Sequence, residues 1–239
     1  MKHQYQQVYI WSRYLRLFHW ANVLIITILL ALGLVIYNAK TLGISVDGKV
    51  LLKTIHVLTG YIFATNLIIR IIFGFIGKGY ERWHNVLPFA KGFTQELIEF
   101  KKHPNTKYKG HSPLGKLMVG ALLLTMSIQM LSGLVLAGTD IYYPPFGQYF
   151  AKSIAIESDK LDLIKPYSTE NVDQQAYKEM RAIRAPFITA HVYSFFTLLF
   201  LIPLHIIGVI MSERKERTAI LSAMINGYKY LPKNNDESS

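Results

Sequence analysis

The hydrophobic residues of this chain gather into four long blocks, instead of recurring at the spacing of a helix with one apolar face. Three blocks contain no Asp, Glu, Lys or Arg, and they comprise 18 residues at 20–37, 23 residues at 117–139 and 28 residues at 185–212. The remaining block, residues 51–76, carries Lys53, His56 and Arg70 within largely apolar sequence. A helix of about 20 apolar residues crosses the roughly 30 Å hydrocarbon core of a bilayer. The pattern therefore predicts an integral membrane protein.

We expect an all-α membrane fold, a bundle of four transmembrane helices over about 17–37, 51–76, 116–139 and 185–212, within a single domain of residues 1–239. The first block has the apolar character of a secretion-signal core, but it is longer than such a core, and no small-residue cleavage site follows Tyr37. It is therefore interpreted as a retained helix. A composition that is 51% hydrophobic and 17% charged agrees with a membrane protein.

The formal net charge of +11 raises the question of a nucleic-acid partner. The basic residues, however, lie in the segments that flank the apolar blocks and do not form one continuous patch, so a nucleic-acid partner is not expected. The chain contains no cysteine. That absence excludes disulfides, thiolate-bound iron–sulfur clusters and the covalent attachment of a c-type haem.

The segments that connect the blocks differ in charge, and the difference predicts their sides of the membrane. Residues 77–116 hold eight basic and three acidic residues, whereas residues 140–184 hold six basic and seven acidic residues. Because cytoplasmic loops carry an excess of Lys and Arg, the first segment is expected inside and the second outside. Both termini, including a tail at 213–239, then lie in the cytoplasm.

Four histidines lie within or at the ends of the apolar blocks, at His19, His56, His191 and His205. Given the predicted topology, His56 and His191 fall near the outer surface, and His19 and His205 fall near the cytoplasmic surface. Fourteen residues of helix separate His191 from His205, which leaves both side chains within about 40° of one face and roughly 21 Å apart. The histidines thus sort by depth into two pairs.

Two pairs of imidazoles predict two haems, each held by two histidines. An isolated histidine in such a block is more often a packing or interfacial residue, and that alternative stays open for each one alone. The pairing of all four by depth favours axial ligation, and no open coordination site then remains on either iron. This arrangement is typical of electron transfer. His3, His84 and His103 lie outside the blocks and are expected to be solvated.

Basic residues and a glycine near these histidines point to the same cofactor. Arg16 and Arg70 are candidates to pair with the propionates of the inner haem, and Lys53 with those of the outer haem. Arg16 and Lys53 also fit a role as interfacial anchors. Gly60 lies four residues after His56 on the same helical face, so that a porphyrin or a neighbouring helix can approach closely.

Several short stretches, in order along nearly the whole chain, resemble a known family. They are Arg16-Leu17-Phe18-His19-Trp20, His56 followed by Gly60, Arg70 through Gly77, Gly110-His111-Ser112-Pro113-Leu114-Gly115, the His191 and His205 pair, and Ser222-Ala223-Met224-Ile225-Asn226-Gly227-Tyr228-Lys229. Together they resemble the bacterial cytochrome b561 and nickel–iron hydrogenase b-type cytochrome family. The resemblance implies four helices, two non-covalent b-type haems on the same histidine pairs, and electron exchange in the bacterial cytoplasmic membrane, within a respiratory chain, between quinone and a periplasmic redox protein.

A quinone site near the inner haem is a further hypothesis, which rests on the family resemblance and on His111, Arg16 and Trp20 meeting at the cytoplasmic interface. A bond from His111 to a propionate, or a role in capping the third helix, are the alternatives. The sequence around 140–147 and 181–187 departs from the hydrogenase subunits. The periplasmic partner therefore stays open between a hydrogenase-like protein and a cytochrome c.

Three classes of function remain at the level of sequence. The first is an electron-transfer subunit of a membrane oxidoreductase, with Tyr142, Tyr143 and Phe146 of the external segment as the expected contacts of its protein partner. The second is a self-contained oxidoreductase similar to b561 proteins that oxidise a small reductant with quinone. The third is a haem-free anchor or a transporter that binds metal through its histidines. We favour the first, because saturated haems and the lack of a flavin or nucleotide motif leave the chain without a catalytic centre of its own.

Overall fold

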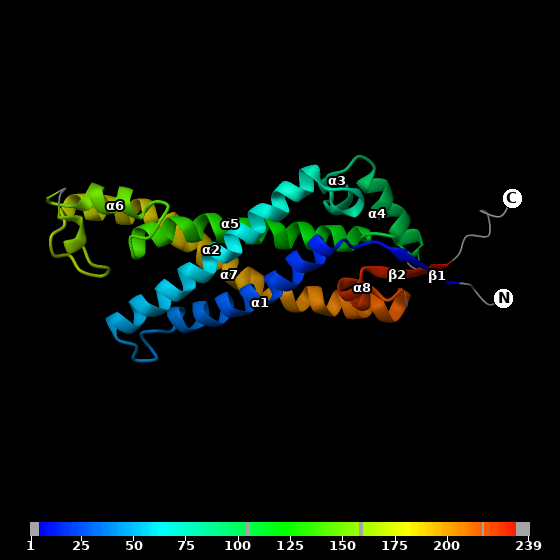
Figure 1. The fold of residues 1–239 in the computed structure, drawn as a ribbon, viewed down its shortest axis with the longest axis horizontal. Coiled ribbons are helices and arrows are strands. Elements are labelled where there is room, and N and C mark those ends of the chain that lie inside the picture. The colour runs from blue at the N-terminus through cyan, green and yellow to red at the C-terminus, as the bar shows by residue number, and fades with distance from the viewer. Residues whose placement is uncertain (1–4, 104–105, 158–159, 217, 233–239) are drawn as a thin grey trace. The chain divides into compact units, whose positions relative to one another are not determined.

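A computed structural model describes residues 5–103, 106–157, 160–216 and 218–232. Four long helices dominate it: α1 (Arg13–Tyr37), α2 (Val46–Ile76), α5 (Pro113–Asp140) and α7 (Gln174–Glu216) (Figure 1). Each is long and apolar enough to cross a membrane. The expected fold class, an all-α membrane protein with four transmembrane helices, is confirmed.

Each long helix begins just after a polar residue whose side-chain oxygen accepts a hydrogen bond from the backbone three residues later. These residues are Ser12, Ser45, Ser112 and Asp173, which accept from the amides of Leu15, Gly48, Gly115 and Ala176. Such N-caps satisfy amides that have no partner within the helix, and they explain why the helices start outside the apolar blocks. The helix that starts furthest ahead of its apolar block is α7, which begins at Gln174 and continues without interruption through Pro203.

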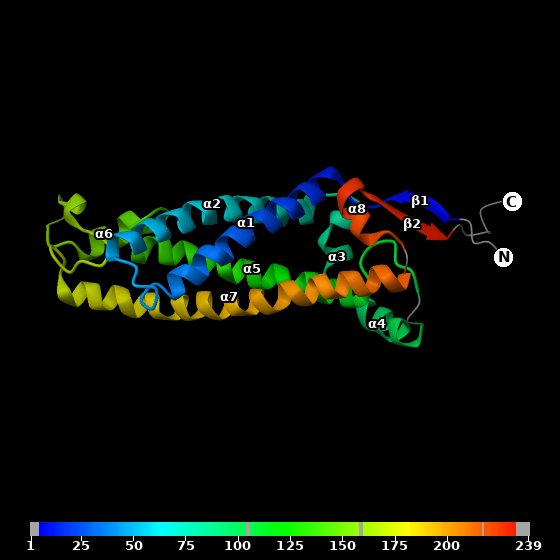
Figure 2. The same ribbon diagram turned by 90° about the horizontal axis from the view of Figure 1, so that it is seen from below.

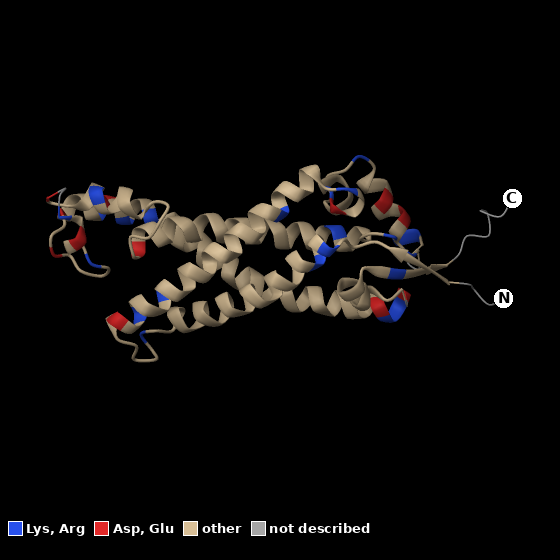
Figure 3. Ribbon diagram, viewed as in Figure 1, with Lys and Arg blue, Asp and Glu red and all other residues tan. Residues whose placement is uncertain are grey.

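The chain divides into two compact units. The first unit comprises residues 1–21, 67–124 and 200–239, and the second comprises residues 22–66 and 125–199. Each long helix therefore contributes one segment to each unit. Figure 3 shows that the charged residues gather at the ends of the long helices and in the connections. Many large apolar side chains of these helices are exposed in the protein alone, including Leu24, Ile62, Leu124 and Phe200. This is the surface expected of helices in contact with lipid.

Within the first unit, the two ends of the described chain pair with each other. Strand β1 (Tyr5–Tyr9) and strand β2 (Tyr228–Pro232) form an antiparallel ribbon (Figure 2). The short helix α8 (Ile220–Asn226) comes just before β2 in the chain. Gly227, at a φ of 95°, turns the chain from α8 into β2, and its carbonyl accepts the amides of Ile10 and Trp11 at 2.8 and 3.2 Å. Only glycine adopts this backbone readily.

The connection from α2 to α5 also belongs to the first unit. It contains the short helices η1 (Gly79–Glu81), α3 (Trp83–Val86) and α4 (Phe93–Lys102). Lys116 near the start of α5 pairs with Glu96 of α4 at 2.7 Å, which fixes α4 against the long helix. His84 and His103 in this connection are exposed, as expected, whereas His3 lies outside the described residues.

Within the second unit, the connection from α5 to α7 folds around a small core of its own. It contains α6 (Gly147–Ile154) and η2 (Leu161–Leu163), and a bridge joins Ala155 to Val172. Its buried core consists of Phe150, Ala151, Ile154, Ile164, Val172 and Met180. The described part of this connection from α5 to α7, called the cap below, is therefore ordered around a core of its own and is not an open loop.

Candidate functional site

The second unit brings together one of the two predicted histidine pairs. The imidazoles of His56 in α2 and His191 in α7 have ring centroids 6.2 Å apart, and their planes cross at 72°. Two imidazoles bound to opposite sides of one metal ion, at about 2 Å per bond, have centroids roughly 6 Å apart. The separation therefore fits axial ligation of a single haem iron.

Glycines allow neighbouring helices to approach both rings. A Cβ atom at Gly33 of α1 would lie 3.7 Å from Cε1 of His56, and one at Gly133 of α5 would lie 3.2 Å from Cε1 of His191. A Cβ atom at Gly60 would meet no described atom within 4 Å. Helix packing therefore gives no reason for a glycine at position 60, and the alternative interpretation, space for a porphyrin, is favoured.

Polar side chains of α5 surround His191, and sequence reasoning missed them. Oγ of Ser132 lies 3.0 Å from Nδ1 of His191, and Nε2 of Gln129 lies 3.0 Å from Nε2 of the same ring. Ser194 of α7 donates to Oε1 of Gln129. A sequence signal existed, because Gln129 and Ser132 are polar residues three apart on one face of an otherwise apolar span.

An ion triad occupies the end of the second unit where α5 meets the cap. Asp140 pairs with both Lys53 and Arg184, and all three side chains are largely buried. Nζ of Lys53 also lies 5.2 Å from the ring centroid of Tyr167. Burial raises the pKa of Tyr167 to about 12, and Asp140 adds to the rise. The charge of Lys53, expected to serve a propionate, thus has a partner within the protein.

The second predicted pair, His19 of α1 and His205 of α7, lies in the first unit. Nδ1 of His19 is buried without a hydrogen-bond partner among the described residues. Buried polar atoms are almost always satisfied. The free nitrogen therefore fits a site that is completed by a bound group.

Two arginines near this pair also have buried, unsatisfied nitrogens. Nη1 of Arg16 and Nη1 of Arg70 are buried without hydrogen-bond partners among the described residues. Arg70 is only 4% exposed, and its guanidinium lies 4.4 Å from the ring centroid of Trp83. Buried guanidinium groups usually bind carboxylates or phosphates. The donor set therefore fits the propionates of a haem.

His111, just before α5, faces the same cationic region. Its ring lies 4.9 Å from that of Trp11, and its Nδ1 is buried without a partner among the described residues. Burial lowers the pKa of His111 to about 3, and the charges of Lys229, Arg70 and Lys116 contribute. The imidazole is therefore neutral at physiological pH.

The segment after α7 supplies residues to this region that the sequence did not indicate. Lys229 is 3% exposed, and its Nζ donates to the carbonyls of Tyr108 and Gly110 at 3.3 and 3.0 Å. Trp20, expected beside His111, instead donates its indole N–H to the carbonyl of Met224 at 2.8 Å. Its indole therefore anchors the segment after α7.

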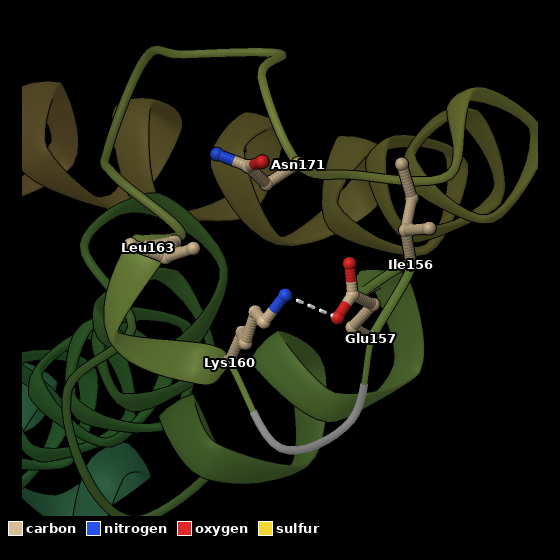
Figure 4. A pocket seen from close by; sticks show the side chains of 5 residues that line it. All are labelled: Ile156, Glu157, Lys160, Leu163 and Asn171. Carbon is tan, nitrogen blue, oxygen red and sulfur yellow. Dashed lines mark ion pairs between the residues drawn. The ribbon is translucent and has the colours of Figure 1, made fainter.

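A small pocket of about 110 Å³ lies in the cap of the second unit (Figure 4). It is lined by Ile156, Glu157, Lys160, Leu163 and Asn171. Its charged residues, Glu157 and Lys160, pair with each other at 2.6 Å. The pocket includes none of the expected site residues. Within the described ranges, no cluster of three or more His, Asp or Glu side chains could hold a metal ion.

Known proteins resemble this chain over most of its length. Residues 10–227 match the family described as prokaryotic cytochrome b561. A probable Ni/Fe-hydrogenase B-type cytochrome subunit of Rhizobium leguminosarum bv. viciae is 26% identical, covering 93% of this chain and 88% of its own length. Its counterpart in Cupriavidus necator is 23% identical, covering 92% of this chain and 86% of its own length. No solved structure matches the chain.

The family match includes all four paired histidines and extends from just before α1 to the turn into β2. It agrees with the expectation raised by the sequence motifs. The chain therefore belongs to the prokaryotic cytochrome b561 family, whose members are multi-pass membrane proteins that transfer electrons through haem b.

Proposed function

We propose that this chain is a di-haem cytochrome b, and that it carries electrons across the bacterial cytoplasmic membrane between quinone and a periplasmic redox protein. The observation that carries the proposal is the 6.2 Å separation of the His56 and His191 rings, because it matches two imidazoles on one iron. The pair His19 and His205 on α1 and α7 would hold the second haem.

The protein side chains determine what such haems do. If two histidines hold each haem, neither iron would have an open site for oxygen or substrate. Bound haem supplies reversible one-electron oxidation and reduction. Arg16 and Arg70 would bind the propionates of the haem in the first unit, since their buried Nη1 atoms have no partner among the described residues.

The proposed quinone site lies in the first unit, beside His111. A neutral imidazole with a free Nδ1 can donate or accept a hydrogen bond at a quinone oxygen without the cost of burying a charge. The alternative, that His111 binds a propionate, predicts haem loss when His111 is replaced. A quinol analogue should reduce the haems of the wild type but not those of His111→Ala, at equal haem content. Equal reduction rates would exclude His111 from the site.

The proposed periplasmic partner would bind the cap of the second unit. The relatives carry names of hydrogenase subunits, so a hydrogenase-like protein and a cytochrome c are both candidates. Of the expected contacts, Tyr142 and Tyr143 are half-buried, whereas Phe146 is 41% exposed. Tyr149 of α6, which the sequence analysis did not single out, is 70% exposed. Phe146 and Tyr149 are therefore accessible aromatic residues of this segment, as is Tyr167, which is 42% exposed.

Haem counting in histidine variants tests the proposal. Pyridine haemochrome analysis of the purified chain should give two haems per polypeptide. His56→Ala and His191→Ala should each lose one haem, and His19→Ala and His205→Ala should each lose the other. His84→Ala and His103→Ala, at exposed positions, are matched controls and should keep both. One haem in the wild type, or unchanged spectra in all four variants, would contradict the assignment.

The orientation is proposed from the charge of the connecting segments and has its own test. A phosphatase reporter, which is active only outside the cytoplasm, should be inactive when fused after Lys102 and active when fused after Lys165. The reverse result would exchange the sides of the two haems.

The self-contained oxidoreductase remains the second candidate function. It predicts that the purified chain, with both haems and no added protein, oxidises a small reductant with quinone at a physiological rate. Failure to turn over without a redox protein, together with rapid haem reduction by a quinol, would favour the electron-transfer subunit.

A further inference from the structure

Both ring nitrogens of His191 lie within hydrogen-bond distance of protein side chains. Its Nδ1 faces Oγ of Ser132, and its Nε2 faces the side-chain amide of Gln129, each at 3.0 Å. Both partners come from α5, whereas His191 lies on α7. Ser132 is 3% exposed, so water does not compete for its hydroxyl.

The hydrogen bonds of Ser132 determine which nitrogen of His191 carries the proton. A serine hydroxyl has a single proton. The acceptors for that proton are the carbonyls of Ile128 and Gln129, at 2.7 and 3.2 Å. With the proton directed to the backbone, the oxygen of Ser132 can accept from His191, and in that arrangement Nδ1 carries the hydrogen. Nε2 then has a lone pair available for a metal.

Gln129 supports the same tautomer by an independent route. The carbonyl oxygen of its side chain accepts from the hydroxyl of Ser194. This orients the NH₂ group of the amide toward Nε2 of His191. With the amide oxygen turned to Ser194, whose hydroxyl also lies 3.2 Å from the carbonyl of His191, the NH₂ group donates to Nε2, which is then the acceptor. The lone pair of Nε2 that accepts from this amide is the one that would bind a metal.

The other histidines with buried Nδ1 atoms differ from His191. Nδ1 of His56, its pair partner, and Nδ1 of His19 are buried without hydrogen-bond partners among the described residues. Of these three rings, only that of His191 has its Nδ1 bound by a protein side chain. The hydroxyl of Ser132 is therefore specific to one haem site.

We propose that Ser132 is a positioning residue that holds His191 in the Nδ1–H tautomer and thereby sets the midpoint potential of the haem bound by His56 and His191. The inference rests on the proposed function, in which His191 is an axial ligand. A hydrogen bond from the distal ring nitrogen orients a ligating imidazole and increases its basicity. A more basic ligand stabilises the oxidised iron, so the bond to Ser132 lowers the potential of this haem.

Ser132→Ala in the purified protein with both haems tests the inference. Potentiometric titration should show a higher midpoint potential for the haem of His56 and His191 and an unchanged potential for the other. The affinity for that haem should fall about 10- to 100-fold, as for other outer-shell partners of metal ligands. Thr139→Val is the matched control. Its hydroxyl is also buried in α5 and bonds a backbone carbonyl, that of Val135 at 3.1 Å, but contacts no imidazole. It should leave both potentials unchanged.

The outcomes separate this inference from the proposed function. Two haems with wild-type potentials and affinities in Ser132→Ala would overturn the role of Ser132 and leave the proposed function intact. Two haems in His191→Ala would overturn both. If Ser132→Ala is isolated with one haem, Ser132→Thr decides, because it keeps the hydroxyl. Recovery of the second haem supports the inference, and failure to recover it contradicts the inference.

Discussion

The two units of the molecule treat buried charge in opposite ways. In the second unit, Asp140 pairs with both Lys53 and Arg184. In the first unit, Arg16 and Arg70 each have a buried Nη1 atom without a hydrogen-bond partner among the described residues. The second unit pairs a buried carboxylate with its two buried cations, whereas in the first unit one guanidinium nitrogen of each arginine has no hydrogen-bond partner among the described residues.

This difference shows what each unit requires from a bound group. A buried charge without a partner costs several kcal/mol, so a protein retains one when another component provides the counter-charge. Under the proposed function, we expect the carboxylates of a haem to supply that counter-charge in the first unit. In the second unit, we expect the haem to be held chiefly through its two imidazoles.

Removal of the acid from the ion triad should produce the largest effect. Asp140→Asn leaves Lys53 and Arg184 largely buried and without a carboxylate, a change that typically costs about 3–5 kcal/mol. The second unit should lose its haem at a lower temperature, which can be followed by the haem absorption during heating. Glu157→Gln is the control, since its pair with Lys160 is exposed and worth about 0–1 kcal/mol. Equal effects of the two changes would contradict the contrast between a buried and an exposed pair.

Removal of a buried cation from the first unit should change the midpoint potential of its haem. The stability of the haem-free protein should change little. Arg70→Leu removes a buried cation, so the loss of positive charge should lower the midpoint potential of the haem held by His19 and His205. Redox titration checks this, with the exposed Arg82→Leu as control. An unchanged potential for that haem would show that Arg70 does not face a propionate.

The low pKa of His111 predicts a dependence of stability on pH. In the unfolded chain, His111 binds a proton below about pH 6.5. In the folded chain its pKa is about 3. Between these values the unfolded state holds one more proton, so stability is lost as the pH falls. His111→Gln should resist acid better than the wild type when unfolding is followed by circular dichroism from pH 7 to pH 4. Identical acid profiles would place the loss at other groups.

The smallest expected effect concerns the surface of the cap. Phe146→Ser and Tyr149→Ser together should slow electron exchange with the periplasmic partner while both haem spectra and quinol reduction stay unchanged, because these side chains are exposed. Stopped-flow oxidation by the isolated partner measures the rate. Phe89→Ser, at an exposed aromatic residue of the first unit, is the control. A wild-type rate in the double variant would place the docking surface elsewhere.

The parts of the structure that hydropathy determines were predictable. The four helices follow from four apolar blocks, and their N-caps at Ser12, Ser45, Ser112 and Asp173 are visible in the sequence. The first eleven residues of α7, from Gln174 to Arg184, lie before the fourth apolar block and are helical nonetheless. This segment is polar, and its stability depends on its cap and on packing in the second unit, which hydropathy does not measure.

The contacts that complete the sites were not predictable, because they join residues far apart in the chain. Ser132 and His191 are 59 residues apart, and Trp20 and the carbonyl of Met224 are 204 residues apart. No local propensity links such positions. Similarly, the sequence of β1 alone does not indicate a strand, because its hydrogen-bond partners lie in β2, at the other end of the described chain.

The pairing of β1 with β2 also sets an order for biosynthesis. Every segment of the second unit, including His56 and His191, has been translated once residue 199 leaves the ribosome. The first unit must wait, since His205 and then Tyr228–Pro232 come last, and β1 stays without its partner strand until they do. We therefore expect the last segment of the second unit to leave the ribosome before the last segment of the first, and β1 to gain its partner strand only after residues 228–232 have left it.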